Sequence, residues 1–386
     1  MMRHPALLIL ALWAAGLGAA AQFGKISVLY DLLVAEYGSA GRVAFMVSIV
    51  GLVGLVFGTT AGIFVQRLGL RRVLLGALLL GAGLSALQAL MLPYVVMMAS
   101  RVLEGVSHLV IVVVAPVMIA QAAPQRHQGL AMTLWSSFFG VSFAGLAVIG
   151  PQLASWHGAE ALFAAHAVFL LAVTAVLAVL LPRLPQAAPP PLSLGGVIRL
   201  HGTLYASPRI VAPAGGFFFY TILYVALLTL LPPLLGADRA LAATAMPLVS
   251  IAVSLTLGVW LLAHVSAVHL VQGGFALAVL AALAMGLCWD APPLRLAAVL
   301  LLAAALGIVQ GASFSSIPQL NADAGDRSLA SGAVAQLGNL GTTTGTPILA
   351  AVIGAFGPAG VVGFAVPLCL GGILVHSLLA GRRRRD

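Results

Sequence analysis

Charged residues are scarce in this sequence: only 7% of its 386 residues are Asp, Glu, Lys or Arg, against about 25% in a soluble domain. Lysine occurs once, at Lys25, and the two cysteines, Cys288 and Cys369, lie inside apolar segments. We therefore expect no disulfide framework, and the absence of spaced His and Cys ligands argues against a metal or haem site. Without a Ser/His/Asp set or a Gly-rich phosphate loop, we also expect neither an enzyme nor a cofactor.

Apolar residues are abundant, making up 62% of the chain, and the mean hydropathy is +1.13. These values are typical of a polytopic membrane protein. The formal net charge of +9 could indicate nucleic-acid binding, but the basic residues are scattered at the ends of apolar runs and gather at Arg382 to Arg385. This distribution favours membrane topology, so we expect the lipid bilayer as a partner and no nucleic acid.

Twelve apolar runs are long enough to cross a membrane as helices, which need about 20 residues each. The first run follows Arg3 and His4. It is too long for a signal peptide and lacks a convincing cleavage site, so we expect it to be retained. The runs cover residues 6–29, 43–64, 73–92, 95–121, 130–154, 161–181, 210–235, 243–264, 270–289, 296–319, 329–354 and 360–380.

The arginines predict the orientation of these runs. One set of alternate loops holds 13 arginines and the other holds 3, namely Arg42, Arg239 and Arg295. Because Lys and Arg accumulate in cytoplasmic loops, both termini are expected in the cytoplasm. We expect a multi-pass protein of the cell membrane, in a bacterium the inner membrane, that acts as a monomer.

The longest segment between runs divides six runs from six. It contains Pro189, Pro190 and Pro191, a stiff and extended composition, followed by a short amphipathic stretch around Leu194 to Tyr205. We predict an N-terminal bundle over 1–182, a cytoplasmic linker over 183–209 and a C-terminal bundle over 210–386. A faint likeness between the segments that begin at Glu104 and Gln310 suggests that the halves are related by duplication.

The fourth run carries three ionisable residues. Arg101, Glu104 and His108 are spaced i, i+3 and i+7, so they share one face of a helix, and Gly105 leaves room beside them. A charge near the bilayer centre costs from roughly 3 kcal/mol upward, so this face should turn towards protein or a watery cavity. We interpret this helix as the wall of a solute pathway.

The loop between the second and third runs carries a family signature. It resembles the Gly-x-Leu-x-Asp-Arg-x-Gly-Arg-Arg motif of the major facilitator superfamily, with Gln66 in place of the usual acid and Leu70 in place of one basic residue. The resemblance implies an all-α polytopic fold of twelve transmembrane helices in two pseudo-symmetric six-helix bundles. It also implies a conformational latch in this loop; the alternative is an ordinary positive-inside loop. The matching residues are Gly62, Arg67, Gly69 and Arg71.

Arg101 and Gly105 also resemble a family pattern in the fourth helix, which is often tied to proton coupling. Desolvation favours the neutral form of Glu104, and a histidine such as His108 titrates near neutrality, so either could carry a coupling proton. The alternative is an internal ion pair between Arg101 and Glu104 that merely satisfies both charges.

The fifth run contains Gly150 and Pro151, similar to the Gly-Pro-x-x-Gly-Gly motif of proton-coupled drug exporters in this family, although Ala154 and Ser155 replace its final glycines. Close packing of helices explains the same residues. An exporter of lipophilic or cationic compounds is therefore kept as the alternative function.

Lys25 lies near the predicted outer end of the first run, with Gln22 one turn away, and Arg101 enters the fourth run at a similar depth. Two cations at matching depth would suit an anionic substrate, with Arg101 able to hold a carboxylate through two hydrogen bonds. The alternative is that Lys25 extends to the membrane surface.

The second half offers uncharged polar and aromatic residues. They could complete a substrate site or hydrogen-bond between helices, while Gly338, Gly341 and Gly345 supply a smooth packing ridge. We predict a proton-coupled secondary transporter of a small organic anion. The candidate substrate-binding residues in this half are Tyr220, Tyr224, Gln310, Gln336 and Asn339.

Overall fold

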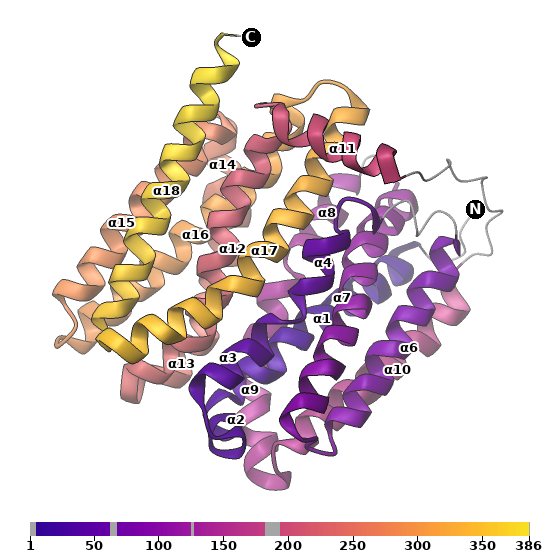
Figure 1. The fold of residues 1–386 in the computed structure, drawn as a ribbon, viewed down its shortest axis with the longest axis vertical. Coiled ribbons are helices and arrows are strands. Elements are labelled where there is room, and N and C mark those ends of the chain that lie inside the picture. The colour runs from indigo at the N-terminus through magenta and orange to yellow at the C-terminus, as the bar shows by residue number, and fades with distance from the viewer. Residues whose placement is uncertain (1–4, 62–67, 125–126, 182–193, 386) are drawn as a thin grey trace. The chain divides into compact units, whose positions relative to one another are not determined.

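The computed structural model describes residues 5–61, 68–124, 127–181 and 194–385 of the chain (Figure 1). In these residues the regular secondary structure is entirely helical. The chain divides into two compact units, Met1–Pro191 and Leu192–Asp386.

The first unit is built from long helices that pack side by side, with shorter helices where the predicted second and fifth runs bend. Its helices are α1 (Pro5–Val28), α2 (Tyr30–Tyr37), α3 (Ala40–Ser48), α4 (Gly51–Phe57), α6 (Leu70–Gln88), α7 (Tyr94–Ala122), α8 (Gln128–Ser136), α9 (Phe138–His157) and α10 (Glu160–Leu180).

The second unit begins with a short helix where the sequence predicts an amphipathic stretch, and it contains one 3₁₀ and one π segment. Its elements are α11 (Leu194–Ala206), α12 (Val211–Leu230), η2 (Pro232–Asp238), α13 (Arg239–Val253), η3 (Ser254–Gly258), α14 (Val259–Leu262), α15 (Ala267–Leu287), α16 (Pro292–Leu320), α17 (Ala324–Phe356) and α18 (Ala359–Arg383).

Within the described residues, each of the twelve predicted runs falls on helical structure, which confirms the all-α polytopic architecture. Among the described residues, 10 helices are long and apolar enough to cross a membrane, or up to 11 if α3 and α4, bent by 44°, form one span. The remaining predicted run, 329–354, coincides with α17. This helix contains many Gly and Thr residues together with Gln and Asn, so its place in the membrane depends on its packing against neighbours.

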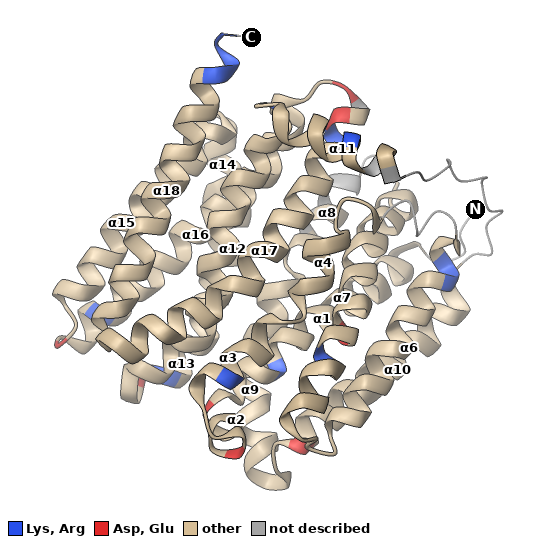
Figure 2. Cartoon of the chain, viewed as in Figure 1, with Lys and Arg blue, Asp and Glu red and all other residues tan. Residues whose placement is uncertain are grey.

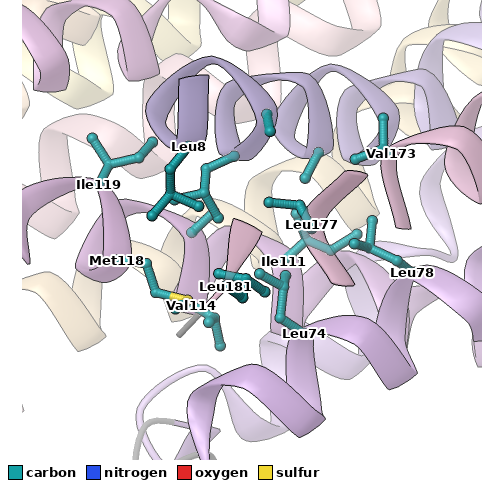
Figure 3. Packing of buried hydrophobic residues seen from close by; sticks show 14 of the residues in the cluster. Leu8, Leu74, Leu78, Ile111, Val114, Met118, Ile119, Val173, Leu177 and Leu181 are labelled. Atoms are coloured by element: carbon teal, nitrogen blue, oxygen red, sulfur yellow. The ribbon is translucent and has the colours of Figure 1, made fainter. Parts of the chain in front are cut away.

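Side chains from α1, α6, α7 and α10 form the core of the first unit (Figure 3). Leu8, Leu74, Ile111 and Leu177 meet there, and Leu74 and Ile111 are 0% exposed. Lipid is as apolar as leucine, so this contact stabilises the bundle through close packing rather than through removal of water. The same four helices also position the polar groups described below.

The glycine ridge of α17 packs against α12. A methyl group added at Gly338 would lie 2.7 Å from the Phe217 ring, while one at Gly341 or Gly345 would collide with the α12 backbone at Ile222. The predicted ridge is therefore confirmed. Only glycine lets these two backbones approach so closely.

Candidate functional site

Most charged residues lie near the ends of helices, but one group lies inside the first unit, at the level of α1 and α7 (Figure 2). The group consists of Lys25, Arg101 and Glu104, each with a side chain that is 0% exposed. Charges so far from water require close partners, because an unpaired charge in an apolar interior is strongly unfavourable.

Glu104 lies at the centre of the group. Its Oε1 accepts a hydrogen bond from Nζ of Lys25 at 2.7 Å, and its Oε2 forms an ion pair with Nη1 of Arg101. Nε2 of Gln88, on α6, donates to the same Oε2 at 3.0 Å. One carboxylate therefore serves two cations that come from different helices, α1 and α7.

Lys25 has all three ammonium hydrogens engaged. Besides Glu104, Nζ donates to Oγ of Ser85 at 2.6 Å and to Oε1 of Gln88 at 2.7 Å. Nδ1 of His166, on α10, lies 3.3 Å from Nζ. Lys25 is fully buried, so the alternative in which it extends to the membrane surface is wrong for this structure. At their matching depth, Lys25 and Arg101 both pair with one carboxylate, that of Glu104.

His166 is held in a defined tautomer. Nε2 lies 2.9 Å from the carbonyl oxygen of Gly18, which can only accept a hydrogen bond, so Nε2 carries the proton. Nδ1 lies 3.3 Å from the Lys25 ammonium, which can only donate, so Nδ1 is an acceptor without a proton and receives the Ser85 hydroxyl at 2.7 Å. The imidazole thus adds no charge of its own, and the group carries two positive charges and one negative charge.

Arg101 is only partly satisfied. Nε donates to the carbonyl oxygen of Met46, on α3, at 3.0 Å, and Nη1 pairs with Glu104. Nη2 is buried and has no hydrogen-bond partner among the described residues. A guanidinium presents its donors in a fixed fork, so Arg101 retains one donor suited to a carboxylate or phosphate oxygen.

Gly105 has a different role from the one expected. Instead of leaving room beside the ionisable residues, it lets α7 approach the junction between α3 and α4, because a methyl group there would collide with the carbonyl oxygen of Val50. This contact holds α7 close to α3, where the carbonyl oxygen of Met46 receives the Arg101 side chain.

His108 and Gln22 lie beside the charged group rather than within it. Nδ1 of His108 is 3.0 Å from the carbonyl oxygen of Ala19, and its ring meets the Phe23 ring edge-on with centroids 5.0 Å apart. Nε2 of Gln22 donates to Oγ of Ser107 at 3.1 Å, while its Oε1 is buried without a partner among the described residues.

The candidates in the second unit do not form one cluster. Tyr220 and Tyr224 stack on each other with centroids 4.9 Å apart, and both are 3% exposed. Gln336 accepts a hydrogen bond from the Tyr205 hydroxyl of α11 at 2.8 Å. Asn339 donates to the carbonyl oxygen of Ala335 one turn earlier, and Gln310 is partly exposed on α16.

The signature loop lies only partly within the described residues. Gly62 and Arg67 lie outside the described residues, whereas Gly69, with a φ of 87°, immediately precedes α6. Arg71 donates to two carbonyl oxygens at the end of α10, those of Ala178 at 2.7 Å and Leu181 at 3.2 Å. It therefore ties the start of α6 to the end of α10.

The exporter-like residues have a packing role. A methyl group at Gly150 would lie 2.7 Å from the Val28 side chain of α1, so Gly150 allows α9 and α1 to come together. Glu104, the buried acid of this unit, is paired with two cations.

Sequence reasoning missed three partners of the charged group: Ser85, Gln88 and His166. His166 is a lone titratable residue inside an apolar span, a signal that could have identified it. Ser85 and Gln88 end an ordinary apolar helix, and only their contacts with Lys25 reveal their role.

Comparison with known families gives one match. Residues 8–324 fit the sequence profile of the Major Facilitator Superfamily, and this match spans most of the first unit and extends into the second. No curated protein matches the chain.

Proposed function

Since the chain belongs to the major facilitator superfamily, and is thus a membrane transporter of a family that does not typically contain enzymes, we propose that it carries a small organic anion together with protons. The observation behind this proposal is the buried group in which Glu104 is shared by Lys25 and Arg101 while Nη2 of Arg101 has no partner among the described residues.

The charge balance favours an anion. With Glu104 ionised and His166 neutral, the group keeps one uncompensated positive charge in an apolar interior. A carboxylate that entered beside Arg101 would neutralise this charge and use the remaining donor of the guanidinium. A cationic solute would add to the imbalance.

The same balance couples the anion to a proton. Protonation of Glu104 alone would leave Lys25 and Arg101 without a counter-charge, which the interior disfavours. When an anion is present, it replaces the lost negative charge, so each ligand strengthens the binding of the other. His108, one turn along α7, is the second proton-handling residue in this proposal.

Alternating access between the two six-helix halves completes the proposal. In the first half Lys25, Gln22 and Arg101 would bind the anion. The signature residues Gly62, Arg67, Gly69 and Arg71 would act in the conformational change of the latch. In the second half the substrate contacts would be Tyr220, Tyr224, Gln310, Gln336 and Asn339.

Transport into proteoliposomes tests the proposal. Radiolabelled mono- and dicarboxylates of up to about six carbons are offered with the outside more acidic than the inside. We expect accumulation of at least one of them that collapses when the pH gradient is abolished. Uptake that ignores the gradient would contradict the proton role, and failure of every carboxylate would contradict the anion.

Two variants sharpen the assay. Arg101→Lys keeps the charge but loses the fork of donors, so we expect the KM for the anion to rise about tenfold or more, the effect of roughly 1.4 kcal/mol. Glu36→Gln, at an exposed acid of α2, serves as the control and should transport normally.

The exporter of lipophilic or cationic compounds is distinguished by a susceptibility screen. Cells that lack the gene would become sensitive to such compounds if export were the function. The anion proposal predicts unchanged susceptibility.

A further inference from the structure

The second unit contains a buried histidine to which the transport proposal assigns no role. His376, on α18, is 0% exposed, and neither Nδ1 nor Nε2 has a hydrogen-bond partner among the described residues. A buried polar group without a hydrogen-bond partner is unfavourable, so an imidazole with both nitrogens unpaired requires an explanation.

Ser313, on α16, lies beside the same point. Its Oγ is buried and also lacks a partner among the described residues. A methyl group built on Gly216, on α12, would lie 2.5 Å from Nε2 of His376 and 3.0 Å from Oγ of Ser313. Three helices thus bring two unpaired polar groups to one point, where both pack against the backbone of Gly216.

The buried surroundings of this point are uncharged, and the charge that acts on His376 is that of Arg383, two turns further along α18, which donates to the carbonyl oxygen of Pro208. Val271, on α15, provides a further wall, 3.2 Å from the same methyl position. Within the described part of the second unit, no Asp, Glu, Lys or Arg is buried. An ionic ligand would therefore find no buried counter-charge among the described residues, and its desolvation would be strongly unfavourable.

We propose that His376, Ser313 and the backbone at Gly216 form a binding site for one small neutral group that both donates and accepts hydrogen bonds, such as water or a hydroxyl. A neutral imidazole has one donor and one acceptor nitrogen, and a serine hydroxyl can act as either. A hydroxyl-sized ligand matches this set, whereas a carboxylate offers acceptors only and brings a charge. The site does not depend on the proposed anion transport.

Solid-state NMR of the full chain in lipid nanodiscs, with 15N-labelled histidine, tests the site directly. The His376 signal is assigned by its loss in His376→Gln. In spectra that transfer magnetisation from bound water, we expect a signal from the His376 ring. The absence of that signal, together with no response to glycerol, would overturn the proposal.

Substitutions at two adjacent glycines provide a matched pair. Gly216→Ala places a methyl group 2.5 Å from Nε2 and so displaces the imidazole, which should abolish the water-transferred signal. Gly215→Ala points instead towards Val375, at 3.2 Å, and should preserve it. If Gly216→Ala fails to fold, Ser313→Ala, which removes one partner of the ligand, should weaken the signal. A water-transferred signal that persists undiminished in both Gly216→Ala and Ser313→Ala would overturn the proposal.

Small probes distinguish the sources of the ligand. A change in the His376 resonance on addition of glycerol would identify a site that accepts a hydroxyl of a solute. A water signal that glycerol leaves unchanged would identify a resident water. Either result supports the site. A change caused by acetate and not by glycerol would contradict a neutral ligand.

Discussion

At the scale of single residues, Glu104 connects three helices of the first unit. Its two oxygens receive Lys25 from α1, Arg101 from α7 and Gln88 from α6. A buried ion pair contributes little net stability when complete, but removal of one partner leaves the other charge exposed to the apolar interior. Substitutions that neutralise one or another of these charged residues should therefore lower the free energy of unfolding by very different amounts.

Replacement of Glu104 by Gln removes the only negative charge of the group and leaves two cations. We expect the free energy of unfolding to fall by about 3–5 kcal/mol, the range measured for broken buried pairs. Lys25→Met should cost less, because Glu104 keeps Arg101 and the group becomes neutral. Unfolding of the purified protein in detergent measures both.

The exposed acid Glu36 provides the control, since Glu36→Gln should leave unfolding unchanged. Equal losses in Glu104→Gln and Lys25→Met would show that the charge balance is not what stabilises the group.

At the scale of elements, α12 and α17 are held together by contact between their backbones. Gly345 lies against the carbonyl of Ile222, which cannot move without disturbing α12 itself. We expect Gly345→Ala to destabilise the second unit by about 1–3 kcal/mol, as overpacking of a core does. Gly354→Ala, on the same helix with open space at its Cα, should be neutral or stabilising. Detergent unfolding of the two variants provides the measurement, and equal behaviour would contradict the close-contact argument.

Arg71 links two elements through the end of α10. The last carbonyls of a helix have no partners within it, and a cation placed there also interacts favourably with the helix dipole. We expect Arg71→Gln to speed hydrogen exchange in residues 177–181, by severalfold for a loss of about 1 kcal/mol. Arg72→Gln removes the same charge from an exposed neighbour and should leave this exchange unchanged. Faster exchange in both variants would indicate a general charge effect.

The elements themselves could be predicted because a membrane allows little else. A run of about 20 apolar residues must form a helix whose backbone groups bond to each other, so each predicted run falls on helical structure. The break at Ser137 between α8 and α9 was not foreseen, because bends depend on tertiary contacts.

The charged group was predictable only in part, for a physical reason. Arg101, Glu104 and Lys25 stand out because charge is rare in the spans, and helical spacing places Arg101 beside Glu104. Which residue on another helix receives Lys25 depends on helix rotation and packing, which the sequence pattern leaves undetermined. That is why Ser85 and Gln88 were missed, and why the pairing of Lys25 with Glu104 was not predicted.

For the whole molecule, charge is divided unevenly between the units. The first has a buried charged group, while the buried polar residues in the described part of the second are neutral. Protonation and anion binding are thus expected to act through the first unit, with the second supplying hydrogen bonds and shape.

Orientation in the membrane is also a property of the whole chain. The loops that hold 13 arginines should face the cytoplasm together with both termini, and the loop between α15 and α16 should face outward. In a Cys288→Ser, Cys369→Ser background, we expect Asp290→Cys, which is exposed in that loop, to react with a membrane-impermeant maleimide in right-side-out vesicles. Arg384→Cys, exposed at the C-terminus, should react only after the vesicles are permeabilised. The reverse labelling pattern would show the opposite orientation. Labelling of both sites in sealed vesicles would place the C-terminus and this loop on the same side of the membrane and contradict the even number of spans.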